Sequence, residues 1–119
     1  MPKPNARNAS PAKLLERDIT RTVRDYLELR GWRAVRINAG PFGKAGMPDF
    51  LWIHYQRRLM FWTEMKAPGG RLGPLQSQWI EDERKRGALV LVVGDVTAFI
   101  NFYEKTFGVG GQLRLGGCA

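Results

Sequence analysis

The sequence predicts a single α/β (α+β) domain, a mixed sheet flanked by helices in the order α-β-β-β-α-β-α. Two observations predict this class: apolar residues recur at helical spacing in some segments, and they alternate or form short β-branched runs in others. The 119 residues, 44% of them hydrophobic, are enough for one compact core and too few for two domains.

The first half of the chain begins with a predicted helix over residues 12–30. Leucine, isoleucine and valine residues recur there every four positions from 15 to 27, and Gly31 then favours a helix end. Residues 32–38 alternate between apolar and polar, which predicts a strand. Residues 39–47 contain three glycines and a proline, so we expect a loop.

Two apolar stretches, residues 49–54 and 59–66, then predict a β-hairpin. The intervening residues Tyr55-Gln56-Arg57-Arg58 lack the Asn-Gly or Asp-Gly pair of a tight turn. Both stretches are apolar on both faces, and we therefore expect a central strand pair covered on each side.

The second half contains a glycine-rich loop, a helix from Pro74 to about residue 86, a buried strand over 88–93 and a last helix over 96–107. The domain organisation that follows is a flexible basic arm over residues 1–11, one folded domain over 12–107 and a glycine-rich tail over 108–119.

Charge restricts the class of partner. Nineteen Lys and Arg against eleven Asp and Glu give a formal charge of +8 and a pI near 10.3. Such a basic domain most often binds a polyanion, above all nucleic acid, although a merely basic protein has the same charge. No apolar run is long enough to span a membrane. The lone Cys118 allows neither an internal disulfide nor a zinc site, so we expect a reducing cytoplasm, in a phage or bacterial setting.

Two acidic residues inside apolar strands predict a metal-binding site. If the hairpin is centred on Gln56-Arg57, Asp49 lies opposite Glu64, with Cβ atoms about 4.5–5.5 Å apart. Two carboxylates so close repel unless a proton or a cation lies between them, and Mg²⁺ favours such a pair. Lys66 shares the strand face of Glu64 and adds an ammonium to the same place.

A third acid, Glu16, falls inside the apolar arc of the first helix, so we expect it to point at the sheet and contribute to the metal site. Each fragment alone has an ordinary interpretation. Pro48-Asp49 could be a turn that leads into a strand, and Glu64 with Lys66 a solvated ion pair. Their combination in a basic chain favours catalysis.

The segments G-M-P-D-F (46–50), E-M-K-A-P (64–68) and G-R-L-G-P-L-Q (70–76), with Trp79 beyond, resemble the PD-(D/E)xK nuclease superfamily. They are most similar to its virus-type replication-repair nuclease family, the VRR-NUC domain, and the resemblance runs from about residue 14 to residue 93. It implies a restriction-endonuclease-like core. It also implies a set of catalytic positions, namely Asp49, Glu64, Lys66, Glu16 and Gln76.

The resemblance implies hydrolysis of DNA phosphodiesters with Mg²⁺ or Mn²⁺. Asp49, Glu64, the backbone carbonyl of Met65 and potentially Glu16 would hold the ion. Lys66 would orient the attacking water or stabilise charge on the phosphoryl oxygens, and Gln76 would bind substrate or Lys66. Stand-alone family members resemble junction-resolving enzymes that act as homodimers, which implies branched DNA such as a Holliday junction, and a part in DNA repair.

Nothing in the sequence has the spacing of a helix-turn-helix or zinc finger, so we expect contacts to DNA phosphates that are guided by shape. The candidate residues are Arg33, Arg36, Lys44, Arg57, Arg58 and Arg71.

The aromatic side chains Trp52, Phe61, Trp62 and Phe102 are core candidates, and some could line a dimer contact. Two alternatives stay open: a sequence-specific restriction-type nuclease, and a non-catalytic nucleic-acid-binding module.

Overall fold

A computed structural model describes residues 11–37 and 46–108 of the chain, with side chains described from residue 16 onward. Its elements are α2 (Pro11–Leu29), β1 (Arg33–Arg36), β2 (Phe50–His54), β3 (Leu59–Met65), α3 (Pro74–Lys85), β4 (Val90–Val93) and α4 (Val96–Phe107). The predicted element order and the α/β class are confirmed. The basic arm over residues 1–10, Lys44 and the tail from residue 109 lie outside the described residues.

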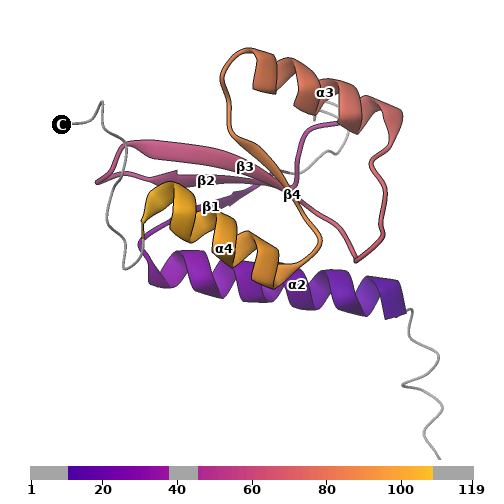
Figure 1. Cartoon of the computed structure of the whole chain (residues 1–119), viewed down its shortest axis with the longest axis horizontal. Coiled ribbons are helices and arrows are strands. Elements are labelled where there is room, and N and C mark those ends of the chain that lie inside the picture. Colours follow the sequence, from indigo (N-terminus) through magenta and orange to yellow (C-terminus); the bar gives the residue numbers. More distant parts are fainter. Residues whose placement is uncertain (1–10, 38–45, 109–119) are drawn as a thin grey trace, which may run out of the picture.

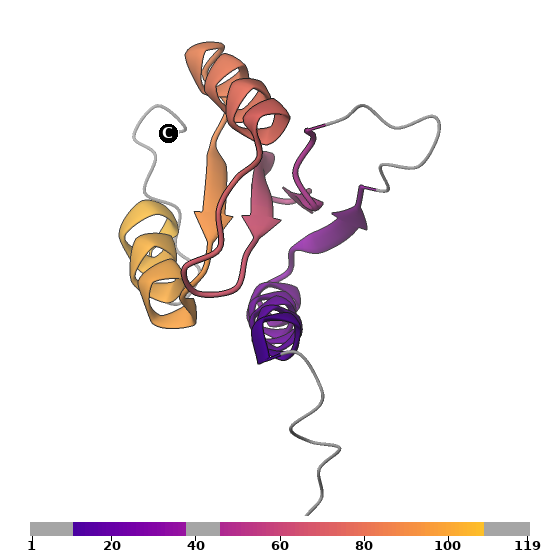
Figure 2. The ribbon, with the colours of Figure 1, turned by 90° about the vertical axis from the view of Figure 1, so that its right-hand side faces the viewer.

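The four strands form one mixed sheet in the order β1-β2-β3-β4. The first three strands are antiparallel, and β4 runs parallel to β3. A parallel pair needs a long crossover connection, and α3 provides it. Helices α2 and α4 lie on one face of the sheet and α3 lies on the other, as Figures 1 and 2 show.

The register of the β2–β3 hairpin is the one that the sequence predicts. Phe50 pairs with Thr63 and His54 with Leu59, so the hairpin is centred on Gln56-Arg57. The turn closes without a glycine because Arg58 adopts a left-handed conformation, with φ of 57°. Asp49 directly precedes β2, and the same register places it opposite Glu64.

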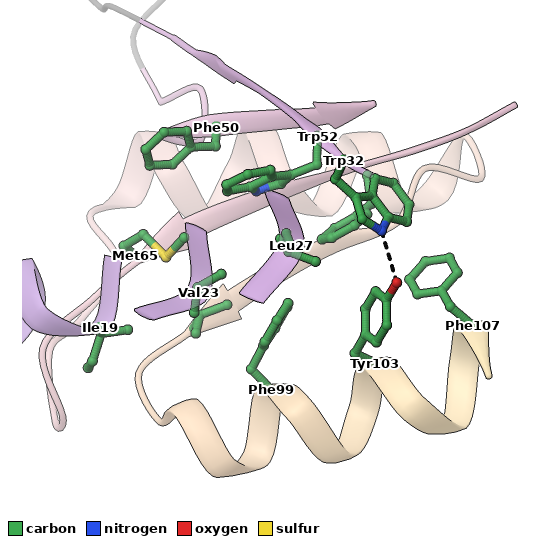
Figure 3. Packing of buried hydrophobic residues seen from close by; sticks show 12 residues of the cluster. Ile19, Val23, Leu27, Trp32, Phe50, Trp52, Met65, Phe99, Tyr103 and Phe107 are labelled. Atoms are coloured by element: carbon green, nitrogen blue, oxygen red, sulfur yellow. Dashed lines mark hydrogen bonds between the residues drawn. The ribbon is translucent and has the colours of Figure 1, made fainter. Parts of the chain in front are cut away.

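The core lies between the sheet and the pair of helices α2 and α4. Figure 3 shows the apolar stripe of α2 and the aromatic residues of α4 packed against one face of β2 and β3. Trp52 and Phe61 have at most 1% of their surface exposed, and the Trp52 Nε1–H donates to the Thr63 hydroxyl at 2.9 Å. These two aromatic residues are therefore core residues and not part of a dimer contact.

The opposite face is covered unevenly. Under α3, Ile80 and Val90 are buried and the indole ring of Trp79 meets that of Trp62 edge-on at 5.1 Å between centroids. Farther along, Ile53 is only half-buried and Met60 is 56% exposed. The prediction that the central strands are covered on both sides is thus wrong for β2 and the start of β3, because α3 lies over β4 and the later part of β3.

One buried hydrogen bond ties the end of α2 to α4. The Trp32 Nε1–H donates to the Tyr103 hydroxyl at 2.9 Å, between side chains that are 2% and 1% exposed (Figure 3). Tyr103→Phe leaves the buried indole N–H without an acceptor, so we expect the free energy of unfolding to fall by about 1–3 kcal/mol.

Urea denaturation measures this loss. Tyr55→Phe is the matched control, because the Tyr55 hydroxyl accepts a hydrogen bond from Arg33 on an exposed surface. We expect a change within about 0.5 kcal/mol for that variant. Equal losses in the two variants would contradict the assigned importance of the buried bond.

Candidate active site

Asp49 is held at the start of β2 by two main-chain interactions. Its Oδ2 accepts a hydrogen bond from the Met65 N–H at 2.9 Å, and its carbonyl accepts one from the Ile37 N–H at 2.8 Å. Asp49 is therefore tied to the end of β3 on one side and to the end of β1 on the other. Its carboxylate is only half-buried, which leaves it accessible from solvent.

Glu64 lies on the neighbouring strand, facing the same side of the sheet as Asp49. It is only 3% exposed, which is unusual for a carboxylate. Its Oε2 accepts a hydrogen bond from Gln76 Nε2 at 2.8 Å and lies 3.5 Å from the ammonium of Lys66. Its Oε1 is buried and has no hydrogen-bond partner among the described residues.

The electrostatics of this carboxylate are incompletely balanced. Burial raises the pKa of Glu64, and the nearby charge of Asp49 raises that pKa further, while Lys66 and the hydrogen bond from Gln76 act in the opposite direction. The raised pKa means that the ionised form is under-compensated. Additional positive charge beside Oε1 would therefore stabilise the site.

A divalent cation fits these groups. Carboxylate oxygens are the ligands that Mg²⁺ and Mn²⁺ prefer, and the unpartnered Oε1 of Glu64 beside Asp49 is such an oxygen. The fit rests on two acids. No group of three or more His, Cys, Asp and Glu side chains that could hold a metal ion occurs within residues 16–37 and 46–108.

Glu16 is the sequence-predicted residue that the structure does not bring to this place. Its side chain is exposed, so the expectation that it lies in the buried arc of the helix is wrong. Figure 1 shows the reason, since the first turns of α2 extend past the ends of the strands. A helical periodicity gives the direction of a side chain, but not whether anything lies opposite it.

Gln76 joins the first turn of α3 to the carboxylates. Pro74 begins α3, and the Oε1 of Gln76 accepts a hydrogen bond from the N–H of Gly73, the residue at the helix N-cap. The other end of the same amide donates to Glu64. The sequence predicts contact with substrate or Lys66, whereas the structure shows that Gln76 fixes Glu64.

Gly46 was not singled out as a site residue, yet it controls how the Asp49 segment meets α3. Its φ is +91°, and a Cβ built there would lie 2.5 Å from the carbonyl oxygen of Leu75. Only glycine allows this approach of two backbones. The sole signal in the sequence is a glycine three residues before the acid, which by itself also fits an ordinary loop.

The predicted DNA contacts fall into separate groups. The exposed ones are Arg33, Arg36, Arg58 and Arg71. The guanidinium of Arg36 lies over the ring of Phe50 at 5.0 Å, on the face of the sheet opposite the acids. Arg57 is half-buried and donates to the Phe107 carbonyl at 3.2 Å, so it fixes the end of α4.

Comparison with known proteins identifies the class. The family model of the VRR-NUC domain matches residues 11–95, which include the whole sheet. The chain therefore belongs to the VRR-NUC family, as the motifs predict, and this family places it among nucleases of the PD-(D/E)xK type, a class of hydrolases that use divalent metals. No curated protein and no solved structure matches the chain. None of the helices in the described part of the chain could cross a membrane.

The raised pKa of Glu64 has a measurable effect on stability. The folded protein holds the Glu64 proton more tightly than the unfolded chain, so its contribution to stability is fully present below the unfolded pKa and is lost as pH rises through the folded pKa. Glu64→Gln cannot ionise, so it avoids the loss of stability at high pH and the charge repulsion from Asp49. We expect the variant to have a higher Tm than the wild type at neutral pH without divalent metal.

Thermal unfolding between pH 4 and pH 8 tests this expectation. The difference between Glu64→Gln and the wild type should grow with pH, and Mg²⁺ or Mn²⁺ should raise the Tm of the wild type but not that of Glu64→Gln. The matched control is Glu81→Gln, since Glu81 is an exposed acid on α3. A variant that is less stable than the wild type at every pH would contradict an under-compensated charge.

The approach of Gly46 to α3 gives a second expectation. Gly46→Ala and Gly87→Ala both place a side chain at positive φ, which costs about 1–2 kcal/mol in each variant. At Gly87 nothing lies within 4 Å of the added Cβ, whereas at Gly46 it meets backbone that cannot move aside freely. We expect Gly46→Ala to lose about a further 1–3 kcal/mol of unfolding free energy in urea titrations. Equal losses of unfolding free energy in the two variants would show that the chain around Gly46 can move away from α3 without cost.

Proposed function

We propose that this chain is a metal-dependent endodeoxyribonuclease that cuts branched DNA, such as a Holliday junction, in the course of DNA repair. One observation carries the proposal. A buried Glu64 carboxylate, one oxygen of which has no hydrogen-bond partner in residues 16–37 and 46–108, lies near Asp49 and 3.5 Å from the ammonium of Lys66. Such a cluster of opposed charges is costly to bury and is typical of a reaction centre.

Mg²⁺ or Mn²⁺ is the proposed cofactor, held by Asp49, Glu64 and the backbone carbonyl of Met65. The Met65 N–H donates towards Asp49, and in a β-strand the carbonyl of a residue faces the same side as its N–H, which favours the third ligand. Glu16 stays outside this set, because no three acidic side chains come together around a possible ion within the described residues. When bound, the ion polarises the phosphate and lowers the pKa of a bound water.

The protein side chains supply orientation and charge. Gln76 holds Oε2 of Glu64, while Oε1 has no hydrogen-bond partner among the described residues and remains available to an ion. Lys66 is 21% exposed, so its ammonium can meet a phosphate oxygen while it stays near Glu64. There it would stabilise the negative charge that develops as the water oxygen bonds to phosphorus and releases a proton to solvent, while the bond to the ester oxygen breaks and that oxygen takes up a proton from solvent.

The DNA is recognised through charge and shape in this proposal. The chain carries a formal charge of +8, and Arg33, Arg58 and Arg71 offer exposed guanidinium groups for phosphate contacts. A homodimer is proposed because two copies place two active sites on two strands, as symmetric cleavage of a junction requires. The cytoplasmic location is proposed only from the lone Cys118.

Cleavage of labelled DNA tests the proposal. With Mg²⁺ or Mn²⁺, the purified chain should cut a four-way junction at symmetric positions and leave a linear duplex of the same sequence largely intact. Asp49→Ala should abolish the cuts, and Lys66→Ala should lower kcat by about 100-fold or more. EDTA should stop the reaction in all cases.

Two controls make the result specific. Asp25→Ala removes an exposed acid of α2 and should leave the rate unchanged, and Lys105→Ala does the same for an exposed lysine of α4. Tight binding of junction DNA without cuts under either metal would favour a non-catalytic binding module. Sequence-dependent cuts in linear duplex would favour a restriction-type nuclease.

A further inference from the structure

A cavity of about 540 Å³ opens beside Lys66, between the loop over residues 67–70, β4 and the first half of α4. We call it the β4–α4 cavity. Figure 2 shows the chain that leaves β3 passing close to the start of α4. The cavity shares Lys66 with the candidate active site but contains none of the acids of that site.

The walls of the β4–α4 cavity suit a flat, uncharged ligand. Among the described residues, the only charged side chains that line it are Lys66 and Asp95. Asp95 already accepts a hydrogen bond from the Thr97 N–H at 3.0 Å as the N-cap of α4. The remaining lining residues are glycine or apolar, and two of them, Val92 and Phe102, are 40% and 37% exposed.

The position of the cavity relates it to the substrate. Val92 pairs with Glu64 and faces the α3 side of the sheet, whereas Leu91 and Val93 face α4, so the cavity that these three residues line extends around the edge of β4 from one face to the other. Lys66 lies 3.5 Å from Glu64 and also lines the cavity, so a phosphate bound at Lys66 would bring its adjoining sugar and base to the cavity. Lys66 at its mouth complements the phosphate charge.

The exposed edge of β4 is a poor site for a β-strand from another chain. β4 has four residues, and the guanidinium of Arg84 donates twice to the Val90 carbonyl, from Nε at 3.1 Å and from an Nη at 2.6 Å. A carbonyl so occupied cannot pair with a further strand, which is a common way of protecting a sheet edge. The apolar wall next to the edge therefore favours a small planar group.

We propose that the β4–α4 cavity receives an unpaired nucleobase from the nucleotide next to the scissile phosphate, stacked on Phe102. This inference rests on the proposed nuclease function and deepens it. Stacking on an exposed aromatic ring tolerates any base sequence. A base at a branch point leaves its helix at lower cost than one within a continuous duplex, so the cavity selects branched DNA by structure.

Binding measurements in EDTA test this proposal without hydrolysis. A set of four-way junctions carries one abasic residue each, at successive positions around the crossover. For the wild type, one position should weaken binding by about fivefold or more, because the stacked base is missing. For Phe102→Ala the intact junction should bind about fivefold more weakly, and the abasic residue at that position should have no further effect.

Phe102→Trp should retain the dependence on the base, and so should Tyr55→Ala, which removes an aromatic ring that is 60% exposed and does not line the cavity. Circular dichroism verifies that each variant is folded. An abasic effect at no position, or one that persists in Phe102→Ala, would overturn the proposal, as would a dimer that Phe102→Ala dissociates. If the protein cuts junctions but shows no abasic effect, the proposed base binding in the cavity is wrong and the nuclease function stands. If it binds in a base-dependent way but does not cut, only the proposed nuclease activity is wrong.

Discussion

The burial of the Glu64 carboxylate beside Asp49 is the constraint on which the rest of the structure depends. A buried charge is costly unless other groups compensate it. Here one oxygen has two partners, the ammonium of Lys66 and the amide of Gln76, and the other has none among the described residues. The folded chain therefore retains a local excess of negative charge at one end of a hydrophobic sheet. This excess lowers the stability of the folded chain, and a bound cation would restore it.

Helix α3 converts this local arrangement into a rigid one. It crosses from β3 to β4, buries Ile80 against the sheet and rests its Trp79 on Trp62. Its first turn then contacts both acidic segments, through Gln76 to Glu64 and through the backbone of Leu75 to Gly46. Glu64 thus lies on β3 and Asp49 directly before β2, and one helix terminus contacts both segments. Such support from outside the reacting groups is what a preorganised site requires.

The two faces of the sheet have different roles. The face towards α2 and α4 is a closed aromatic and aliphatic core, with hydrogen bonds for both buried indoles. The face towards α3 is only partly covered and carries the acids and Lys66 near the ends of the strands. Because one strand alternates between the two faces, β3 can contribute Phe61 and Thr63 to the core and Glu64 to the site.

Spacings of two and of about 3.6 residues act locally, and they were enough to predict the element order, the hairpin register and the placement of Asp49 near Glu64 and Lys66. The remaining features depend on how distant segments pack together. Glu16 follows the helical period yet is exposed, since α2 extends past the strands, and Gln76 reaches Glu64 because α3 crosses over β3. The Gly46 contact and the β4–α4 cavity likewise join residues far apart in the chain, and no local period encodes such distances.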